Sequence, residues 1–205
     1  MKHKNLVLLL LLFGAVHTFA QSTVGCDFWV TFMPNFRLEQ QYPGRALYLK
    51  MSAARACSGM VTNPRTNWSS EFNVAVNQIT TLEIPLEQAV NEEASDTILD
   101  IGLHVMATDS ISLFAFNFRE YSLDASCIFP VKALGDDYLV QCYAPNSIEG
   151  DTAMRSEFSV LALEDNTMVE IQLTSSDTKG GHHAGNIFNV VLAAGQCYQV
   201  QSVPL

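Results

Sequence analysis

The stretch Phe72-Asn73-Val74-Ala75-Val76 has a second copy, Phe188-Asn189-Val190-Val191-Leu192, near the C-terminal end of the chain. Each copy is followed by a second segment in which apolar residues alternate with polar ones. These segments are Leu82-Glu83-Ile84-Pro85 and Tyr198-Gln199-Val200-Gln201. Alternation with a period of two is typical of strands that have one face on a core. The repetition therefore predicts a duplicated β unit.

The first copy continues into more strand-like sequence, through Gly102-Leu103-His104-Val105 to the run from Ile111 to Asn117. The second copy reaches Leu205 without an equivalent continuation. We therefore expect one β domain over residues 21–205. Its first unit covers about 26–125, and its second unit covers about 126–205 and is incomplete at the C-terminus.

Two hairpins are predicted from the alternation. Folding the chain about Asp165-Asn166 places six apolar residues on one face, namely Phe158, Val160, Ala162, Val169, Ile171 and Leu173. A second hairpin is expected about Thr108-Asp109-Ser110. There Phe114, Phe116 and Phe118 occupy the face opposite the apolar one, which predicts a strand covered on both sides. Helical signal is confined to 86–94. Many short strands at even spacing predict an all-β fold, an antiparallel β-sandwich.

Residues 1–20 have the pattern of a secretory signal peptide. Lys2 and Lys4 precede an apolar run from Leu6 to Phe13, and Thr18-Phe19-Ala20 provides small residues before Gln21. The apolar run is shorter than the roughly 20 residues of a membrane span. We expect a protein that is secreted or on the cell surface, with no membrane span after cleavage.

The charge balance excludes some partners. The chain carries 21 acidic and 11 basic residues, for a net charge of −10. Nucleic acids and anionic membrane surfaces are bound through clusters of Lys and Arg, and the sequence has none. We therefore expect no nucleic-acid partner.

Five cysteines lie in the part expected to be exported, and an odd number leaves at least one unpaired. If strands 127–132 and 138–143 form a hairpin, Cys127 and Cys142 lie opposite each other. Directly opposed β-carbons are about 4.5–5.5 Å apart, which is near the geometry of a disulfide. Cys127–Cys142 is thus the disulfide candidate. The alternative is a pair of buried free thiols.

Catalytic and metal-binding motifs are lacking. The sequence contains no Gly-x-Ser-x-Gly, no phosphate-binding loop and no His-Glu-x-x-His. His182-His183 is interpreted as a solvated turn, and Asp136-Asp137 as turn chemistry, although Glu149 and Asp151 follow in the next loop. We predict no cofactor, no metal and no enzymatic activity. A secreted hydrolase that acts on carbohydrate through a carboxylate pair remains the alternative.

Several segments resemble the N-terminal domain of the IgGFc-binding protein family, which occurs in mucus-associated animal proteins and in exported bacterial ones. The matching segments are Asp27 to Phe32, Val105 to Asn117, Phe129 to Tyr138, Ser156 to Val160 with Glu164-Asp165-Asn166-Thr167, and Tyr198 to Ser202. The family pattern continues beyond the last of these, which agrees with an incomplete second unit.

The resemblance implies an adhesion or ligand-binding module of the cell envelope whose partner is an extracellular protein or a glycan such as mucin. Binding to the constant region of immunoglobulin G is implied by the family name only. A purely structural module of a larger envelope protein is the other alternative, since a fold does not fix a function.

Overall fold

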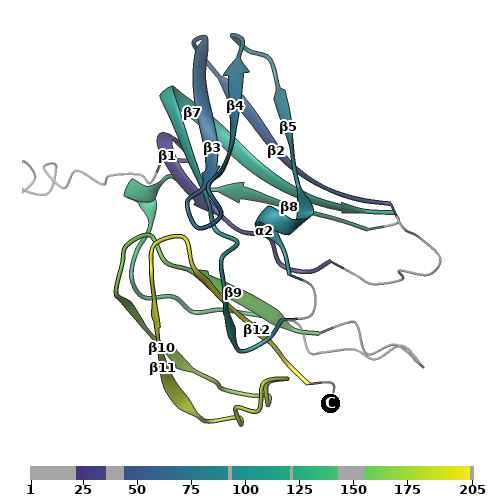
Figure 1. Ribbon diagram of the computed structural model, residues 1–205, viewed down its shortest axis with the longest axis vertical. Coiled ribbons are helices and arrows are strands. Elements are labelled where there is room, and N and C mark those ends of the chain that lie inside the picture. The colour runs from purple at the N-terminus through teal and green to yellow at the C-terminus, as the bar shows by residue number, and fades with distance from the viewer. Residues whose placement is uncertain (1–21, 36–43, 92–93, 121, 143–154, 204–205) are drawn as a thin grey trace, which may run out of the picture.

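The computed structural model describes residues 22–35, 44–91, 94–120, 122–142 and 155–203 (Figure 1). Nearly all regular structure is β. The first region holds β1 (Val24–Val30), β2 (Arg45–Ala53), β3 (Cys57–Asn63), β4 (Trp68–Val74), β5 (Thr80–Ile84), β6 (Thr97–Leu99), β7 (Leu103–Arg119) and β8 (Ser122–Ile128). The second region holds β9 (Glu157–Leu161), β10 (Thr167–Gln172), β11 (Ile187–Leu192) and β12 (Cys197–Gln201). The described residues also include two short helices, α2 (Leu86–Ala89) and η1 (Val131–Ala133). All pairings between these strands are antiparallel, which confirms the predicted fold class.

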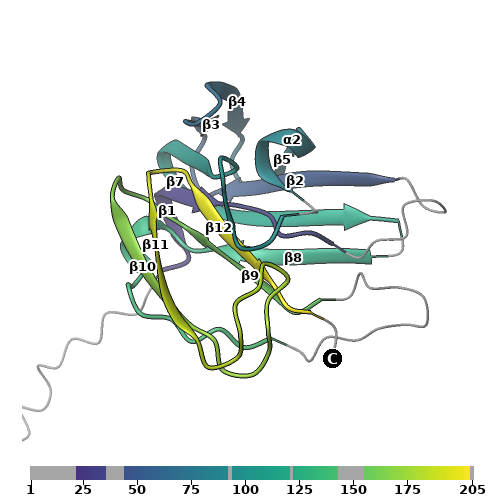
Figure 2. The same ribbon diagram turned by 60° about the horizontal axis from the view of Figure 1, so that its bottom comes forward.

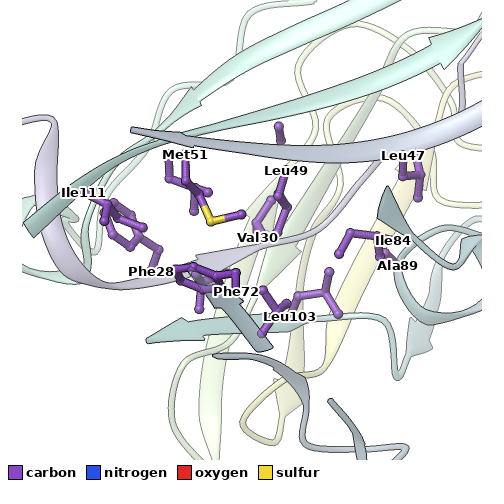
Figure 3. Close-up of a cluster of buried hydrophobic side chains, with 14 of the residues drawn as sticks. Phe28, Val30, Leu47, Leu49, Met51, Phe72, Ile84, Ala89, Leu103 and Ile111 are labelled. Carbon is purple, nitrogen blue, oxygen red and sulfur yellow. The ribbon is translucent and has the colours of Figure 1, made fainter. Parts of the chain in front are cut away.

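The long strand β7 organises the first region. Its N-terminal half pairs with β1 and β3, and its C-terminal half pairs with β2 and β8. The strand order β4-β3-β7-β2-β5 therefore bends at β7 and brings two layers face to face. Figure 3 shows Leu47, Leu49 and Met51 of β2 opposite side chains of β1 and β4.

Alternation explains why this core forms. In β2 the apolar residues Leu47, Leu49 and Met51 are buried, whereas Tyr48 and Lys50 between them face outward. Strand side chains point to opposite faces in turn, so a strict period of two supplies one apolar face. Each fully buried side chain of this size contributes roughly 1.5–3 kcal/mol.

The second region has its own smaller core. β9 pairs with β12, which also pairs with β6, while β10 pairs with β11 in a separate ribbon (Figures 1 and 2). The prediction of a hairpin over 158–173 is therefore wrong, because β9 and β10 do not pair. Asn166, with a φ of 59°, turns the chain from one ribbon to the other. Ala162 and Val169 still pack into one core, as the alternation predicted.

The turn predicted at Thr108-Asp109-Ser110 is also wrong, because β7 runs through it without reversing. Hydrogen bonds hold this part of β7 in place. Thr108 Oγ1 donates to the Ser58 carbonyl, and Asp109 Oδ1 accepts from Arg55 Nη2 at 3.0 Å. Thr, Asp and Ser are common in turns, but here their side chains bind the neighbouring strand.

The hairpin predicted from 127–132 and 138–143 does not form. β8 ends at Ile128 and pairs with β7, the one-turn helix η1 follows, and residues 138–142 are not in a strand. The helical turn expected within 86–94 is present as α2.

β12 lies between the two cores, and all five of its residues are buried. Tyr198 and Val200 face the second core. On the opposite face, the Gln199 side chain donates hydrogen bonds to the carbonyls of Asn91 and Ala94 at 3.1 and 2.7 Å. Within the described residues, the helices are too short to cross a lipid bilayer. The predicted signal peptide lies outside these residues.

Candidate binding surface

The outer side of the β2-β7-β8 layer presents a row of aromatic rings. We call this surface the aromatic face, made of Tyr48, Lys50, Phe114, Phe116, Phe118 and Leu123. Phe114 and Phe118 are 40% and 41% exposed. The prediction that this strand is covered on both sides is therefore wrong for its outer side. Only the inner side, with Leu113 and Ala115, is buried.

Register explains how the rings come together. Phe114 and Phe116 lie opposite Lys50 and Tyr48 of β2, and Phe118 lies opposite Leu123 of β8. Residues two apart on a strand are about 7 Å apart, so the three phenylalanines form a flat row. The Lys50 ammonium lies 4.6 Å from the centre of the Phe116 ring, a cation–π contact that leaves a positive charge on the surface.

A contiguous exposed apolar patch of this kind marks an interaction surface on a soluble protein. Aromatic rings bring a large contact area with few rotatable bonds, which is why they are enriched at the centres of protein interfaces. The arrangement on β7 is thus suited to binding.

The outer side of the other layer carries a second aromatic group. Trp29 stacks on His104 with ring centres 4.4 Å apart, and His104 Nε2 lies 2.8 Å from Asp27 Oδ1. Each partner of the imidazole is a cross-strand neighbour from β1. These contacts hold His104 between β1 side chains as part of the sheet surface.

His182 and His183 point to different partners. The His182 ring stacks on Phe188 at 3.7 Å, whereas His183 Nδ1 lies 3.0 Å from Asp177 Oδ2. The pKa of Asp177 is lowered, first by a hydrogen bond from the Ala184 N–H and then by His183. Within the described residues, no group of three or more metal-ligating side chains is found. The geometry agrees with a structured turn.

Cys127 and Cys142 are both free thiols in the structure. Cys127 lies opposite Phe114 in the β7–β8 pair, and Cys142 Sγ donates a hydrogen bond to the Glu157 carbonyl at 3.4 Å. The hairpin that would place the two sulfurs opposite each other is absent, so strand register gives the predicted disulfide no support.

Two other thiols are poor nucleophiles. Burial raises the pKa of Cys197 to about 11, and burial followed by the charge of Asp109 raises the pKa of Cys57. A reactive cysteine needs a lowered pKa, so neither side chain resembles a catalytic one.

One carboxylate that sequence reasoning missed has unusual electrostatics. Burial raises the pKa of Glu157 to about 7, and the charge of Asp124 contributes to the same shift, although the side-chain amide of Gln201 donates a hydrogen bond that opposes it. Glu157 comes from β9 and Asp124 from β8, two strands that do not pair. Only the three-dimensional arrangement brings their charges together. Asp136 and Asp137 are exposed, and Glu149 and Asp151 lie outside the described residues.

A shallow hollow of about 470 Å³ lies beside the start of β1, the end of β2 and the middle of β7. It is lined by Val24, Ser52, Ala53, Ala54, Asn77, Gln78, Ile79, Ser110 and Ser112. None of these side chains is an acid, a base or a thiol. The lining provides hydroxyl and amide groups without the paired titratable groups that acid–base chemistry requires.

The fold and its aromatic face together define an antiparallel β-sheet protein whose clearest surface feature is suited to binding. Residues 124–204, from β8 through β12, match a family model described as IgGFc binding protein. This match confirms the family resemblance over these residues, and the family's description favours a binding module over an enzyme. No curated protein and no solved structure matches the chain.

Proposed function

We propose that this protein is an exported, non-enzymatic binding module that recognises an extracellular protein through the aromatic face. The observation that carries the proposal is the row of Phe114, Phe116 and Phe118 on the outer side of β7. The family description, which names binding to the Fc part of immunoglobulin G, supports a protein partner. Export rests on residues 1–20, and a secreted product that begins at Gln21 is its direct test.

The chemistry of the face favours protein over glycan. Three rings in line, a leucine and a partly shielded ammonium supply mainly apolar contact area. Sugars need hydrogen-bonding groups beside the rings. In this surface only the Tyr48 hydroxyl and the Lys50 ammonium provide them. The aromatic face thus resembles the apolar centre of a protein interface, where a few aromatic side chains carry most of the binding energy.

The proposal is tested with the protein from Gln21 to Leu205 and immobilised immunoglobulin G, its Fc fragment and purified mucin. We expect binding to the Fc fragment. Replacing Phe114 and Phe118 by serine is expected to weaken binding at least tenfold, since truncating a central aromatic contact costs about 2 kcal/mol or more. Surface plasmon resonance measures the change.

The matched control replaces Met60 and Met106 by serine. Both are exposed apolar residues on the outer side of the other layer, with exposure close to that of Phe114 and Phe118. The affinity of this control variant for the Fc fragment should equal that of the parent protein. Equal losses in both double variants would contradict a role specific to the aromatic face. Binding to mucin alone would assign the protein to glycan recognition and refute the proposed partner.

The raised pKa of Glu157 beside Asp124 gives the hydrolase alternative its one specific observation. A carboxyl group protonated near neutral pH is the property of a general acid in glycoside hydrolysis. Release of reducing sugar from mucin by the parent protein, abolished in Glu157→Gln, would establish this activity. We expect no release from either protein.

A further inference from the structure

The shallow hollow lies one row of residues beyond the aromatic face. In strand register, Val24 of β1 lies opposite Ser112 of β7, and Ser112 lies opposite Ser52 of β2. Lys50 and Phe114 form the neighbouring row. Residues two apart on a strand are about 7 Å apart and point to the same face. The hollow and the aromatic face therefore share the outer side of one sheet.

The turn between β4 and β5 forms one wall of the hollow, and backbone hydrogen bonds hold it in place. Asn77 N–H donates to the Ala53 carbonyl at 3.0 Å, and Gln78 N–H donates to the Ala75 carbonyl at 3.2 Å. Asn77 has a φ of 55°, in the left-handed region that asparagine adopts more readily than most residues. The side chains of Asn77 and Gln78 thus line the hollow from a fixed backbone.

The polar side chains of the hollow are available to a ligand. Within the described part of the chain, the hydroxyls of Ser52 and Ser112 form no hydrogen bond. The same holds there for the side-chain amides of Asn77 and Gln78. A hydroxyl both donates and accepts, and a primary amide has two donors and an acceptor oxygen. The hollow therefore offers donors and acceptors from its floor and from one wall.

Apolar side chains flank these polar groups. Val24 and Ile79 are 39% and 73% exposed, and both line the hollow. Continuing the antiparallel register of β2 and β5 by one residue places Ile79 opposite Ser52. The row across the sheet is thus Val24, Ser112, Ser52 and Ile79, with hydroxyls in the middle and apolar groups at both ends. A ligand that fits this row has hydrogen-bonding groups and an apolar part.

The charges around the hollow exclude several kinds of ligand. None of the residues that line it is an acid or a base. Next to the lining residues in the chain, Arg55 pairs with Asp109, with 2.7 Å between Nε and Oδ2. The Lys50 ammonium of the neighbouring row lies over the Phe116 ring. Phosphates and carboxylates are bound by cations, and metal ions by carboxylates or imidazoles. The hollow is therefore suited to a neutral ligand.

An added peptide strand does not fit this place, because the floor of the hollow is the interior of a sheet. At Ser112, β7 pairs with β1 on one side and with β2 on the other. β2 in turn pairs with β5, and Ala53 forms a bridge to Val76. Strand addition needs an open edge with free backbone groups. Recognition of a ligand in the hollow therefore depends on side chains.

From the lining, the charge and the position in the sheet we infer that the hollow binds a neutral N-acetylated hexose unit of a glycan. The hydroxyls of Ser52 and Ser112 pair with hydroxyls of the sugar ring. The amides of Asn77 and Gln78 pair with the acetamido group, and Ile79 contacts its methyl group. The volume of about 470 Å³ lies within the range of about 300–1,000 Å³ that is usual for ligand sites. This inference goes beyond the proposed function, because it assigns a second kind of ligand to a second site.

The test titrates the isotope-labelled protein from Gln21 to Leu205 with methyl N-acetyl-β-glucosaminide and follows the backbone amides by NMR. We expect saturable shifts at Ser52, Asn77 and Gln78, with a dissociation constant on the order of 1 mM for so small a ligand. The amide of Ser69, on the outer side of the other layer, should not shift. Methyl β-glucoside lacks the acetamido group and should bind about fivefold more weakly, because its hydrogen bonds to the amides are lost.

Variants of the lining locate the site. Ser52→Ala combined with Ser112→Ala removes both hydroxyls and should weaken binding of the N-acetylated glycoside about tenfold. Ser58→Ala combined with Ser69→Ala is the matched control, since both serines are exposed on the outer side of the other layer, and it should bind like the parent. Ala54→Trp fills the hollow with an indole ring and should abolish binding. Circular dichroism checks that the variants are folded, and the titration of the parent protein remains decisive if they are not.

The inference is overturned by equal affinity for the two glycosides, by the absence of saturable shifts, or by shifts that do not involve Asn77 and Gln78. Unchanged affinity in the double variant at Ser52 and Ser112 would also overturn it. The result is independent of the proposed function. That double variant should retain binding to the Fc fragment, and replacing Phe114 and Phe118 by serine should retain binding of the glycoside.

Discussion

The first and second regions have the same strand pairing but differ in how well their cores are closed. β2–β5 and β9–β12 show the same register, with Leu49 opposite Leu82 and Val160 opposite Tyr198. Leu49 is fully buried, whereas Val160 is only partly so. The shared pairing therefore does not by itself close a core. A strand distant in the sequence, β7 in the first region, determines whether the core they form is sealed.

The largest expected difference between the regions is the loss of stability when Phe72 or its counterpart Phe188 is replaced by alanine. Phe72→Ala should lower the free energy of unfolding by about 3–5 kcal/mol, because it opens a cavity in a sealed core. Phe188→Ala should cost less than half of this, because its ring is partly exposed and its main neighbour is the His182 ring. Urea denaturation followed by tryptophan fluorescence and circular dichroism measures both.

Equal losses in the two variants would show that the second core is as closed as the first.

The next prediction concerns the pH dependence of the free energy of unfolding. Glu157 should contribute to it, whereas Ala46, which occupies the equivalent position in β2, should not. The folded-state pKa of Glu157 is raised from the ordinary 4.5 to about 7. The folded protein therefore holds this proton more tightly than the unfolded chain. Its stabilising contribution is complete below pH 4.5 and is lost as the pH rises through 7. The loss is about 3 kcal/mol at most.

Urea midpoints at intervals from pH 4 to pH 8, for the parent protein and Glu157→Gln, isolate this contribution. The parent should lose stability relative to Glu157→Gln between pH 4.5 and 7, with no further change above. Parallel curves would show that Glu157 titrates normally. Ala46→Ser in the first region serves as a control for mutation at the equivalent position and should leave the pH dependence unchanged.

A smaller expected effect on stability concerns the loops that connect β3 to β4 and β10 to β11. The β3–β4 connection is held by buried Asn63, whose side chain accepts hydrogen bonds from the backbone N–H groups of Arg65 and Thr66. The longer β10–β11 connection is held from the other region. Asp96 accepts hydrogen bonds from Thr178 Oγ1 and the Gly180 N–H, each at 2.8 Å.

We expect Asp96→Ala to cost about 1–3 kcal/mol, the typical penalty for leaving a buried partner, here the Thr178 hydroxyl, unsatisfied. Amide exchange at Gly180 should accelerate, and exchange at Thr66 should not change. Asp96→Asn preserves one acceptor oxygen and should cost less. An unchanged exchange rate at Gly180 in Asp96→Ala would show that the connection is held by other contacts.

The sequence predicted the faces of the strands better than their partners. Ala162 and Val169 share a core as expected, yet they belong to different ribbons. A period of two shows which side chains face inward, but it is the same whether the next strand pairs beside the first or crosses to another sheet. Thr108-Asp109-Ser110 was misinterpreted for a related reason. Turn-forming residues also suit a bend that is hydrogen-bonded to a neighbouring strand.

The candidate site was only partly visible in the sequence. The alternation of Phe114, Phe116 and Phe118 was recognised, but exposure depends on what other segments cover, which periodicity does not show. Glu157 was missed because its pKa shift arises from burial and from Asp124, more than thirty residues away in the chain.

The pairing of β6 with β12 places a strand from the first half of the chain in a sheet of the second region. Residues 97–99 precede the predicted unit boundary near 125 and 126, yet they form part of a sheet with β9 and β12. A gene split at that boundary would separate β12 from a neighbour on which it depends, and the Gln199 side chain would lose the carbonyls that it binds. The two regions are therefore not structurally independent of each other. A second region produced without residues 97–99 would expose the edge of β12 that β6 covers.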